Sequence, residues 1–124
     1  MHEFIDAFRK HPLLTYLHEA KADLFRTLGH PVRVRVLELL LAGPQPVHEL
    51  LDEIQIEASS LSQQLSVLRR MGLVSSSRDG AKVVYTLSAP EVAALMDAAR
   101  NVLTTVLSDR EDLLAELRSS SAAQ

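Results

Sequence analysis

The segment from Val47 to Leu87 restricts the fold of this chain more than any other part of it. The sequence predicts a short helix over 47–54 (VHELLDEI) and a second helix over 59–71 (SSLSQQLSVLRRM). A hairpin over 73–87 follows and turns at Asp79-Gly80, a pair that is favoured in tight hairpin turns. Two helices joined by a turn and followed by a hairpin are typical of a winged helix-turn-helix.

The rest of the chain is predicted to be helical. Apolar residues recur at three- and four-residue spacing over 13–28, and Pro31 begins a further helix that runs to about residue 42. The stretch 43–46 (GPQP) breaks the chain, and Ser88 is predicted to cap a long last helix that reaches about Leu117. We therefore expect a mainly α fold with a β-hairpin, in which the helices pack with a C-terminal two-stranded wing and the terminal helices are long.

Three parts of the chain are expected: an N-terminal extension over 1–12, one domain over 13–118 and a small, polar, flexible tail over 119–124. No apolar run approaches the roughly 18 residues that cross a membrane, and no signal peptide is evident. The chain has no cysteine, which excludes disulfides, a thiolate metal site and a thiol redox switch. These features predict a cytoplasmic protein that does not bind membranes.

Charge is unevenly distributed along the chain. The formal net charge of −3 is the wrong sign for binding phosphate backbones. Residues 47–57 hold four carboxylates and no Lys or Arg, whereas residues 58–87 hold four Lys or Arg side chains and one carboxylate, a local charge of +3. Because electrostatic steering depends on the local field, this second segment is predicted to face double-stranded DNA.

The predicted helix over 59–71 has two different faces. At 100° per residue Leu61, Leu65 and Leu68 share one face, which must pack on the core. The opposite arc carries hydroxyl, amide and guanidinium groups, which suit base edges and phosphates. We expect Ser59, Ser60, Ser62, Gln63 and Ser66 to read bases, and Arg70, Arg78 and Lys82 to contact phosphates, or the minor groove in the case of the hairpin.

Simpler interpretations exist for several of these residues. A serine at a helix start is an ordinary cap, and Arg69 and Arg70 suit the negative end of the helix dipole. Gln64 lies near the apolar margin and is ambiguous. A polar arc of this extent is not needed for capping, which favours the DNA-binding interpretation.

The last predicted helix is apolar over a wide arc. A helix of this kind is buried on more than one side, and a small domain covers only one of them. The other side suits a second copy of the chain, and a symmetric dimer predicts a palindromic operator. The alternative is a helix absorbed by its own core. The residues predicted to lie at the interface are Val92, Leu95, Met96, Ala99, Val102, Leu103, Val106 and Leu107.

Three blocks, LGHPVRVRVLELL (28–40), SSLSQQLSVLRRMGLV (59–74) and RDGAKVVYTL (78–87), resemble the ArsR/SmtB family of bacterial transcriptional repressors. The resemblance implies a homodimeric, DNA-binding repressor. It places Ser59, Ser62 and Gln63 in the major groove and 78–82 at the wing tip. Ala58 departs from the polar residue often found there, so one base contact is in doubt. The family dimerises through its first and last helices, which adds three residues to the interface: Leu13, Leu17 and Leu24.

The resemblance also implies positions for metal ligands and for structural residues. One family site needs cysteines in the stretch matching 47–52, and another needs histidine in the last helix; this chain has neither. We therefore expect no metal and no cofactor, and the effector is unknown. His11 and His18 lie seven residues apart and are an alternative, non-standard metal site. In the helix-start motif, His30 is expected to be structural, and Arg33 and Arg35 are expected to pair with carboxylates within the fold.

Two other classes of function fit the sequence less well than DNA binding. A winged-helix module that binds proteins would expose apolar side chains on its second helix, where this chain carries polar ones. An enzyme would need a nucleophile–base pair, a phosphate loop or a metal-ligand set, and none stands out. The sequence therefore predicts a regulator and not an enzyme. A repressor that senses a metal or a small ligand at a non-standard site remains an alternative.

Overall fold

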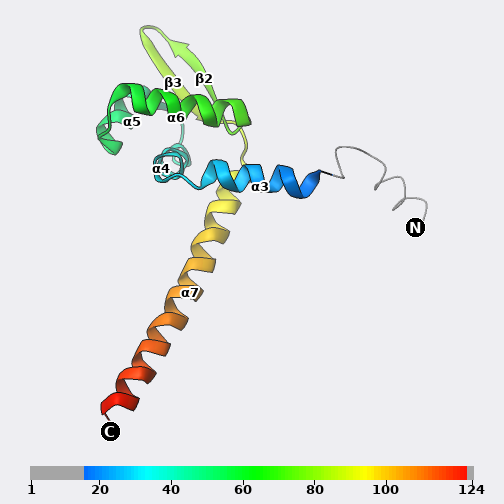
Figure 1. Cartoon of the computed structure of the whole chain (residues 1–124). Coiled ribbons are helices and arrows are strands. Elements are labelled where there is room, and N and C mark those ends of the chain that lie inside the picture. The colour runs from blue at the N-terminus through cyan, green and yellow to red at the C-terminus, as the bar shows by residue number, and fades with distance from the viewer. Residues whose placement is uncertain (1–15, 123–124) are drawn as a thin grey trace, which may run out of the picture. The chain divides into compact units, whose positions relative to one another are not determined.

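A computed structural model describes residues 16–122 of the chain (Figure 1). The predicted extension over 1–12 and the predicted interface residue Leu13 lie outside this range. The described residues form two compact units, one that ends at Ala89 and one that begins at Pro90. The first unit contains the elements α3 (Leu17–Leu28), α4 (Pro31–Leu40), β1 (Gln45–Pro46), α5 (Val47–Ile54), α6 (Ala58–Met71), β2 (Val74–Asp79) and β3 (Lys82–Leu87), and the second contains α7 (Glu91–Ala122).

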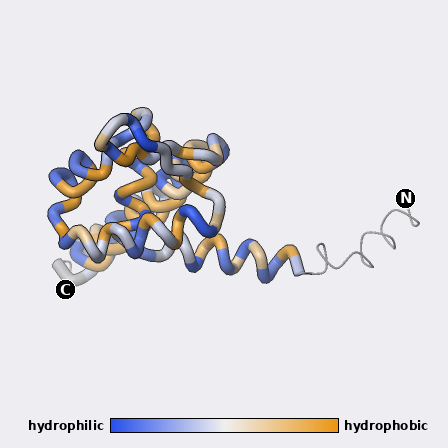
Figure 2. Tube along the Cα trace, turned by 90° about the horizontal axis from the view of Figure 1, so that it is seen from above, coloured by the Kyte–Doolittle hydropathy of each residue, from blue (hydrophilic) through white to orange (hydrophobic). Residues whose placement is uncertain are grey.

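The predicted fold is confirmed: helices α5 and α6 form the helix-turn-helix, and strands β2 and β3 form the wing. Helix α6 packs on α3, α4 and β2. Figure 2 shows the hydrophobic residues, in orange, concentrated toward the middle of the first unit. The core side chains of this unit are Val36, Leu37, Leu40, Leu50, Leu61, Leu65, Leu68, Leu73, Val74 and Tyr85, all at most 9% exposed.

Helix α4 begins where the sequence motif places it. Pro31 occupies the first turn, where its missing N–H has no partner to lose. The preceding residue, His30, is the N-cap, and its Nδ1 accepts a hydrogen bond from the backbone N–H of Val32 at 3.2 Å. The expectation that His30 is structural is confirmed, because its ring satisfies a backbone donor that the helix start leaves open.

Gly72 ends α6 as predicted. Its φ of 84° is left-handed, a conformation that costs a glycine little. The reversal lets Leu73 N–H donate to Leu68 O and Gly72 N–H donate to Arg69 O, both at 3.0 Å. These two bonds satisfy carbonyls at the helix end in a Schellman arrangement and send the chain directly into the wing.

The sheet has a third strand that the sequence did not predict. Strand β1 pairs antiparallel with β3, so the strand order is β1-β3-β2. The stretch 43–46 is rich in Pro and Gly, so its sequence indicates a chain break and not a strand. Pro46 is tolerated because β1 is an edge strand, where a missing N–H costs no ladder bond on the open side.

Ser88 does not cap the last helix, which begins at Glu91. Its hydroxyl donates to Gly72 O at 2.8 Å, and its backbone N–H donates to Leu73 O at 3.0 Å. Ser88 therefore closes the base of the wing against the end of α6. The prediction was wrong because the hydrogen bonds of Ser88 are made to residues that are distant in sequence.

Helix α7, described here by itself, is 32 residues long. It continues past the predicted end at Leu117, and the residues expected to begin a tail at Ser119 are helical as far as Ala122. Serine and alanine do not stop a helix as glycine or proline would. Within residues 16–122, no helix is long and apolar enough to cross a membrane.

The stability contribution of the left-handed conformation at Gly72 can be tested by substitution. We expect Gly72→Ala to lower the free energy of unfolding by about 1–2 kcal/mol, because no atom lies within 4 Å of the added Cβ and the cost is that of the left-handed backbone. Gly72→Asn, which tolerates this conformation better, should lose less. Urea unfolding at one fixed protein concentration measures both. Equal stability of Gly72→Ala and wild type would contradict this account.

Candidate nucleic-acid interface

Helix α6 buries one face and leaves the other open, as its sequence predicts. Leu61, Leu65 and Leu68 are at most 1% exposed, which confirms the predicted inward face. The outward arc is polar and accessible in the single chain: Ser59, Ser62, Gln63 and Arg70 are exposed, and Ser60 and Ser66 are half-buried.

Gln64 and Arg33 form a contact that the sequence did not predict. The Nε–H of Arg33 donates to Gln64 Oε1 at 2.7 Å, and an Nη1–H of Arg33 donates to the carbonyl oxygen of Thr27 at 3.2 Å. Arg33 was expected to pair with a carboxylate, and that prediction was wrong: its partners are an amide and a backbone carbonyl. One guanidinium therefore ties the end of α3 and the middle of α6 to α4.

Arg35 does pair with carboxylates, as expected. Its guanidinium lies 3.7 Å from Glu38 and 3.8 Å from Glu53, with all three side chains about half exposed. Residues 33 and 35 point in roughly opposite directions because two residues turn a helix by about 200°. Only Arg35 therefore faces the acidic helix α5. The spacing of the two arginines in the sequence is enough to predict that they have different surroundings.

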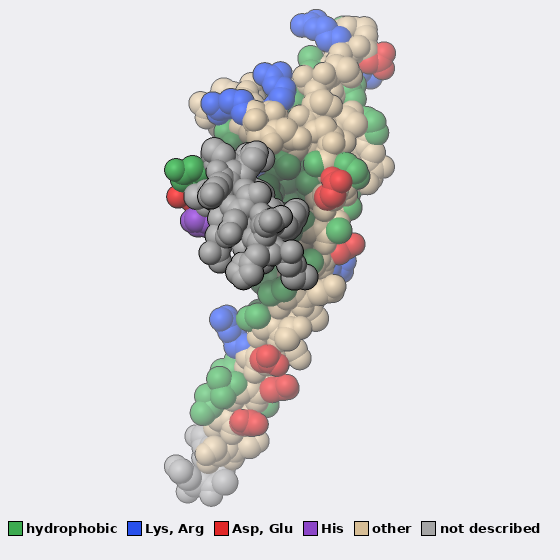
Figure 3. Space-filling model, turned by 90° about the vertical axis from the view of Figure 1, so that its right-hand side faces the viewer, with side chains coloured by type: hydrophobic (Ala, Val, Ile, Leu, Met, Phe, Trp, Pro, Cys, Tyr) green, Lys and Arg blue, Asp and Glu red, His purple; other side chains and the backbone are tan. Residues whose placement is uncertain are grey.

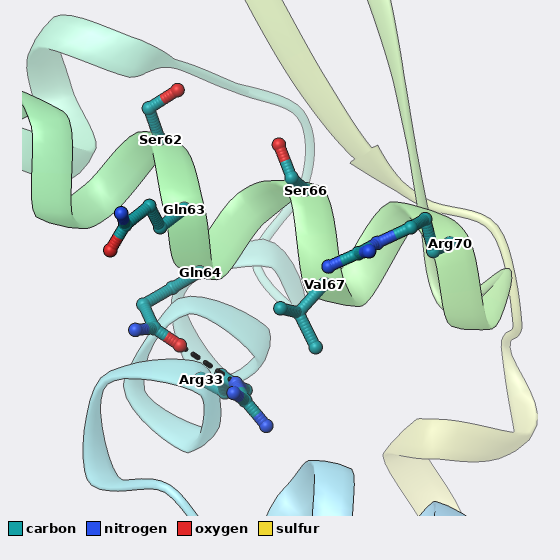
Figure 4. Close-up of a pocket in the computed structure, with 7 residues that line it drawn as sticks. All are labelled: Arg33, Ser62, Gln63, Gln64, Ser66, Val67 and Arg70. Carbon is teal, nitrogen blue, oxygen red and sulfur yellow. Dashed lines mark hydrogen bonds between the residues drawn. The ribbon is translucent and has the colours of Figure 1, made fainter.

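A hollow of about 450 Å³ lies against the outward side of α6. It brings together four of the predicted DNA-binding residues with Gln64, Val67 and Arg33. Figure 4 shows Ser62 and Ser66 along the upper edge of α6, Arg33 below Gln64, and the Arg70 side chain running back along the helix toward Val67. The residues that line the hollow are Arg33, Ser62, Gln63, Gln64, Ser66, Val67 and Arg70, none of them acidic.

The wing carries the other predicted cations at its far end. In the β2–β3 register Arg78 lies opposite Val83, and Asp79 lies opposite Lys82, so both basic residues flank the turn at Gly80. Both are exposed. Figure 3 shows Lys and Arg side chains, in blue, on the surface of the first unit. Arg69, at the end of α6, donates to Ser76 Oγ at 3.4 Å and so contacts the wing.

The acidic side chains of this unit gather elsewhere. A second hollow, of about 380 Å³, lies between α4, β1 and α5, and its lining residues are Glu38, Leu39, Ala42, Gln45, Glu49, Asp52 and Glu53. Four carboxylates at one place repel phosphate, so the α6 and wing face is the side of this unit that suits DNA. In the described part of the chain, no three His, Cys, Asp or Glu side chains are placed to hold a metal ion.

The predicted interface residues on α7 are mostly bare in the single chain. Val102, Leu103, Val106 and Leu107 are 45–62% exposed, and Ala99 is also exposed. Leu95 and Met96 are half-buried, and Val92 is buried. On α3, Leu17 is 41% exposed and Leu24 is half-buried.

The fold and the polar, basic face of α6 and the wing define a winged helix-turn-helix DNA-binding protein. Residues 30–76 match the family described as "Bacterial regulatory protein, arsR family". The uncharacterized HTH-type transcriptional regulator Rv0081 of Mycobacterium tuberculosis (strain H37Rv) is 48% identical over 108 residues, which are 86% of this chain and 95% of that protein.

Solved structures of similar proteins include the following two. The crystal structure of M. tuberculosis Rv0081 matches with a TM-score of 0.72 and 50% identity, over 76% of this chain and 95% of that one. The transcriptional repressor BigR from Xylella fastidiosa matches with a TM-score of 0.65 and 36% identity, over 73% and 91%. The chain belongs to the arsR family of bacterial regulatory proteins. It is a DNA-binding transcriptional regulator, and the repressor role expected from its sequence is supported.

The contribution of the exposed wing cations to DNA binding can be tested by substitution. Each phosphate that a cation neutralises adds about 0.9 to the slope of log affinity against log salt. We expect Arg78→Ala/Lys82→Ala to weaken promoter binding and to lower this slope by about 2 for each bound subunit. Fluorescence anisotropy with a promoter duplex at several salt concentrations measures both.

The matched control for the wing variant is Arg26→Ala/Arg118→Ala, which removes the same charge from exposed sites on α3 and α7. The control should keep the wild-type slope. Equal losses of affinity and of salt slope in the two variants would show that promoter binding depends on the total charge and not on the wing.

Proposed function

We propose that this protein is a homodimeric repressor that binds a palindromic operator with two copies of α6. The single observation that carries the proposal is the accessible polar arc of α6, which packing does not use. In this proposal α6 lies in the major groove and the wing lies on the flanking backbone. In this arrangement Ser59, Ser60, Ser62, Gln63 and Ser66 read base edges. Arg70, Arg78 and Lys82 contact phosphates or, in the case of the two wing residues, the minor groove.

Gln63 is the side chain of the arc best suited to discriminate bases. A glutamine amide donates and accepts in one plane and so matches the two groups that adenine presents in the major groove. Serine hydroxyls both donate and accept and are therefore less selective. Base preference in the operator should accordingly be strongest where Gln63 points.

The dimer is proposed to form along α7. Its apolar residues follow a heptad pattern, with Met96, Leu103 and Leu117 in one row and Ala99, Val106 and Leu113 in the other. Exposure of leucines and valines along this helix to water is unfavourable, and a second copy of the chain would bury them.

Arg110 indicates the direction in which two α7 helices would pair. It interrupts the first row of the heptad, so a parallel pair would place Arg110 beside the partner's Arg110. An antiparallel pair places it opposite the row that contains Ala99, where a small side chain leaves room for the guanidinium. We therefore propose an antiparallel, two-fold symmetric pairing.

The release of this repressor from DNA is proposed not to use the thiolate metal chemistry of its family. The chain has no cysteine, and the helix that matches the cysteine-bearing one is α5, which carries His48, Glu49 and Asp52. His18 lies on α3, whereas His11, the second half of the alternative site, lies outside the described residues.

The base-reading proposal is tested with Ser62→Ala/Gln63→Ala. A lost amide contact to a base costs about 1–3 kcal/mol of discrimination, so we expect affinity for the operator to fall at least tenfold while affinity for unrelated DNA is retained. Competition binding with operator and scrambled duplexes measures the ratio of the two affinities. The control Gln45→Ala/Ser119→Ala changes the same residue types away from α6 and should keep the ratio. Retained preference in the α6 variant would contradict the assignment.

The dimer proposal is tested with Val106→Asp. Val106 is 45% exposed in the single chain, so the fold of one subunit should tolerate the change, whereas a charge buried in an interface is not tolerated. We expect a monomer by sedimentation velocity, with unchanged helix content and weaker operator binding. Ser108→Asp, which adds the same charge outside the two apolar rows, should remain dimeric. A dimeric Val106→Asp protein would refute the proposed pairing.

A further inference from the structure

The hollow between α4 and α6 has the chemistry of an anion site, and only part of it belongs to the predicted base-reading arc. Two guanidinium groups line it, from Arg33 on α4 and Arg70 on α6, together with the hydroxyl-bearing Ser62 and Ser66. No acidic side chain is among its lining residues. A volume of about 450 Å³ is ample for one phosphate group.

Arg33 is held in place and still has donors to offer. An arginine carries five N–H donors. Two of them are used within residues 16–122, one by Gln64 Oε1 at 2.7 Å and one by Thr27 O at 3.2 Å. Three N–H groups are therefore left on a half-buried side chain that is already ordered. Binding an anion there costs less conformational entropy than ordering a free surface arginine.

Arg70 supplies the second cation of the hollow. It is exposed, and Figure 4 shows its side chain lying back along α6 toward Val67; both Arg70 and Arg33 line the hollow. The two arginines offer charge and forked donors, which match the oxygens of a phosphodiester.

We propose that this hollow is a backbone phosphate site of the bound DNA and that Arg33 is a further DNA-contacting residue. The inference rests on the proposed placement of α6 in the major groove, whose edges are lined by phosphates. A phosphate held by Arg33 also positions α6, because the same guanidinium holds the Gln64 amide. The contact thus anchors α6 on the DNA backbone without reading sequence itself.

The test compares Arg33→Met with Arg35→Met. Both remove one cation from α4, but Arg35 faces the acidic helix α5 and pairs with Glu38 and Glu53. Binding to an operator duplex selected from a random pool, and to a scrambled duplex, is measured over a range of salt. We expect Arg33→Met to weaken both by a similar factor, about tenfold, and to lower the salt slope by about 2, because one phosphate contact is lost in each half-site. Arg35→Met should match wild type.

A second measurement removes charges from the DNA and compares the wild type with conservative variants. Methylphosphonate groups placed one at a time along the operator remove single phosphate charges, and we expect one position per half-site at which wild type loses affinity and Arg33→Lys loses less. Gln64→Leu, which removes the intramolecular bond and keeps the cation, should retain the wild-type salt slope.

Three outcomes would overturn the inference. An unchanged slope with reduced discrimination in Arg33→Met would mean that Arg33 only holds Gln64. The absence of a sensitive methylphosphonate position would mean that no single phosphate occupies the hollow. Inorganic phosphate that binds in the hollow without weakening DNA binding would show that the hollow is a site for a free anion. If wild type showed no preference for the selected duplex, the proposed base-reading role of α6 would be contradicted. The salt slopes of wild type and Arg33→Met would still test the phosphate site.

Discussion

The packing of three leucines on α6 fixes the orientation on which the rest of the interface depends. Leu61, Leu65 and Leu68 are at most 1% exposed, and α6 contacts α3, α4 and β2. Full burial of one leucine contributes roughly 1.5–3 kcal/mol, and a helix of 14 residues would be marginal by itself in water. The same burial that makes α6 stable therefore points its serines, Gln63 and Arg70 outward.

Electrostatics explains why an acidic protein can use this face. The formal net charge is −3, yet four carboxylates of the first unit gather at the hollow between α4 and α5, whereas four basic residues, Arg69, Arg70, Arg78 and Lys82, lie on α6 and the wing. Arg33 and Arg35 show the separation within a single helix, because they point to opposite sides. A weak total charge limits non-specific affinity, so the choice of target rests on base contacts and on the spacing of two half-sites.

Much of the fold follows from local patterns in the sequence. Helix α5 has the predicted bounds, α6 begins one residue earlier than predicted, and Gly72 ends α6 in the predicted way. Local signals suffice there because capping and helical periodicity involve neighbouring residues. Strand β1, the bonds of Ser88 and the partners of Arg33 were not predicted, since each depends on residues far away in the chain. The chemical character of the candidate site was evident from the sequence, whereas its inclusion of Arg33 required the packing of α4 on α6.

The most direct measurement of the central claim is a nuclear magnetic resonance titration of the labelled protein with a duplex that it selects from a random pool. The account predicts that the largest amide shifts fall on the outward arc of α6, from Ser59 to Arg70, and on the wing around Arg78 and Lys82. Amides around the acidic hollow, such as those of Glu49 and Asp52, should move little. Shifts concentrated at the acidic hollow, with α6 and the wing unchanged, would contradict the account.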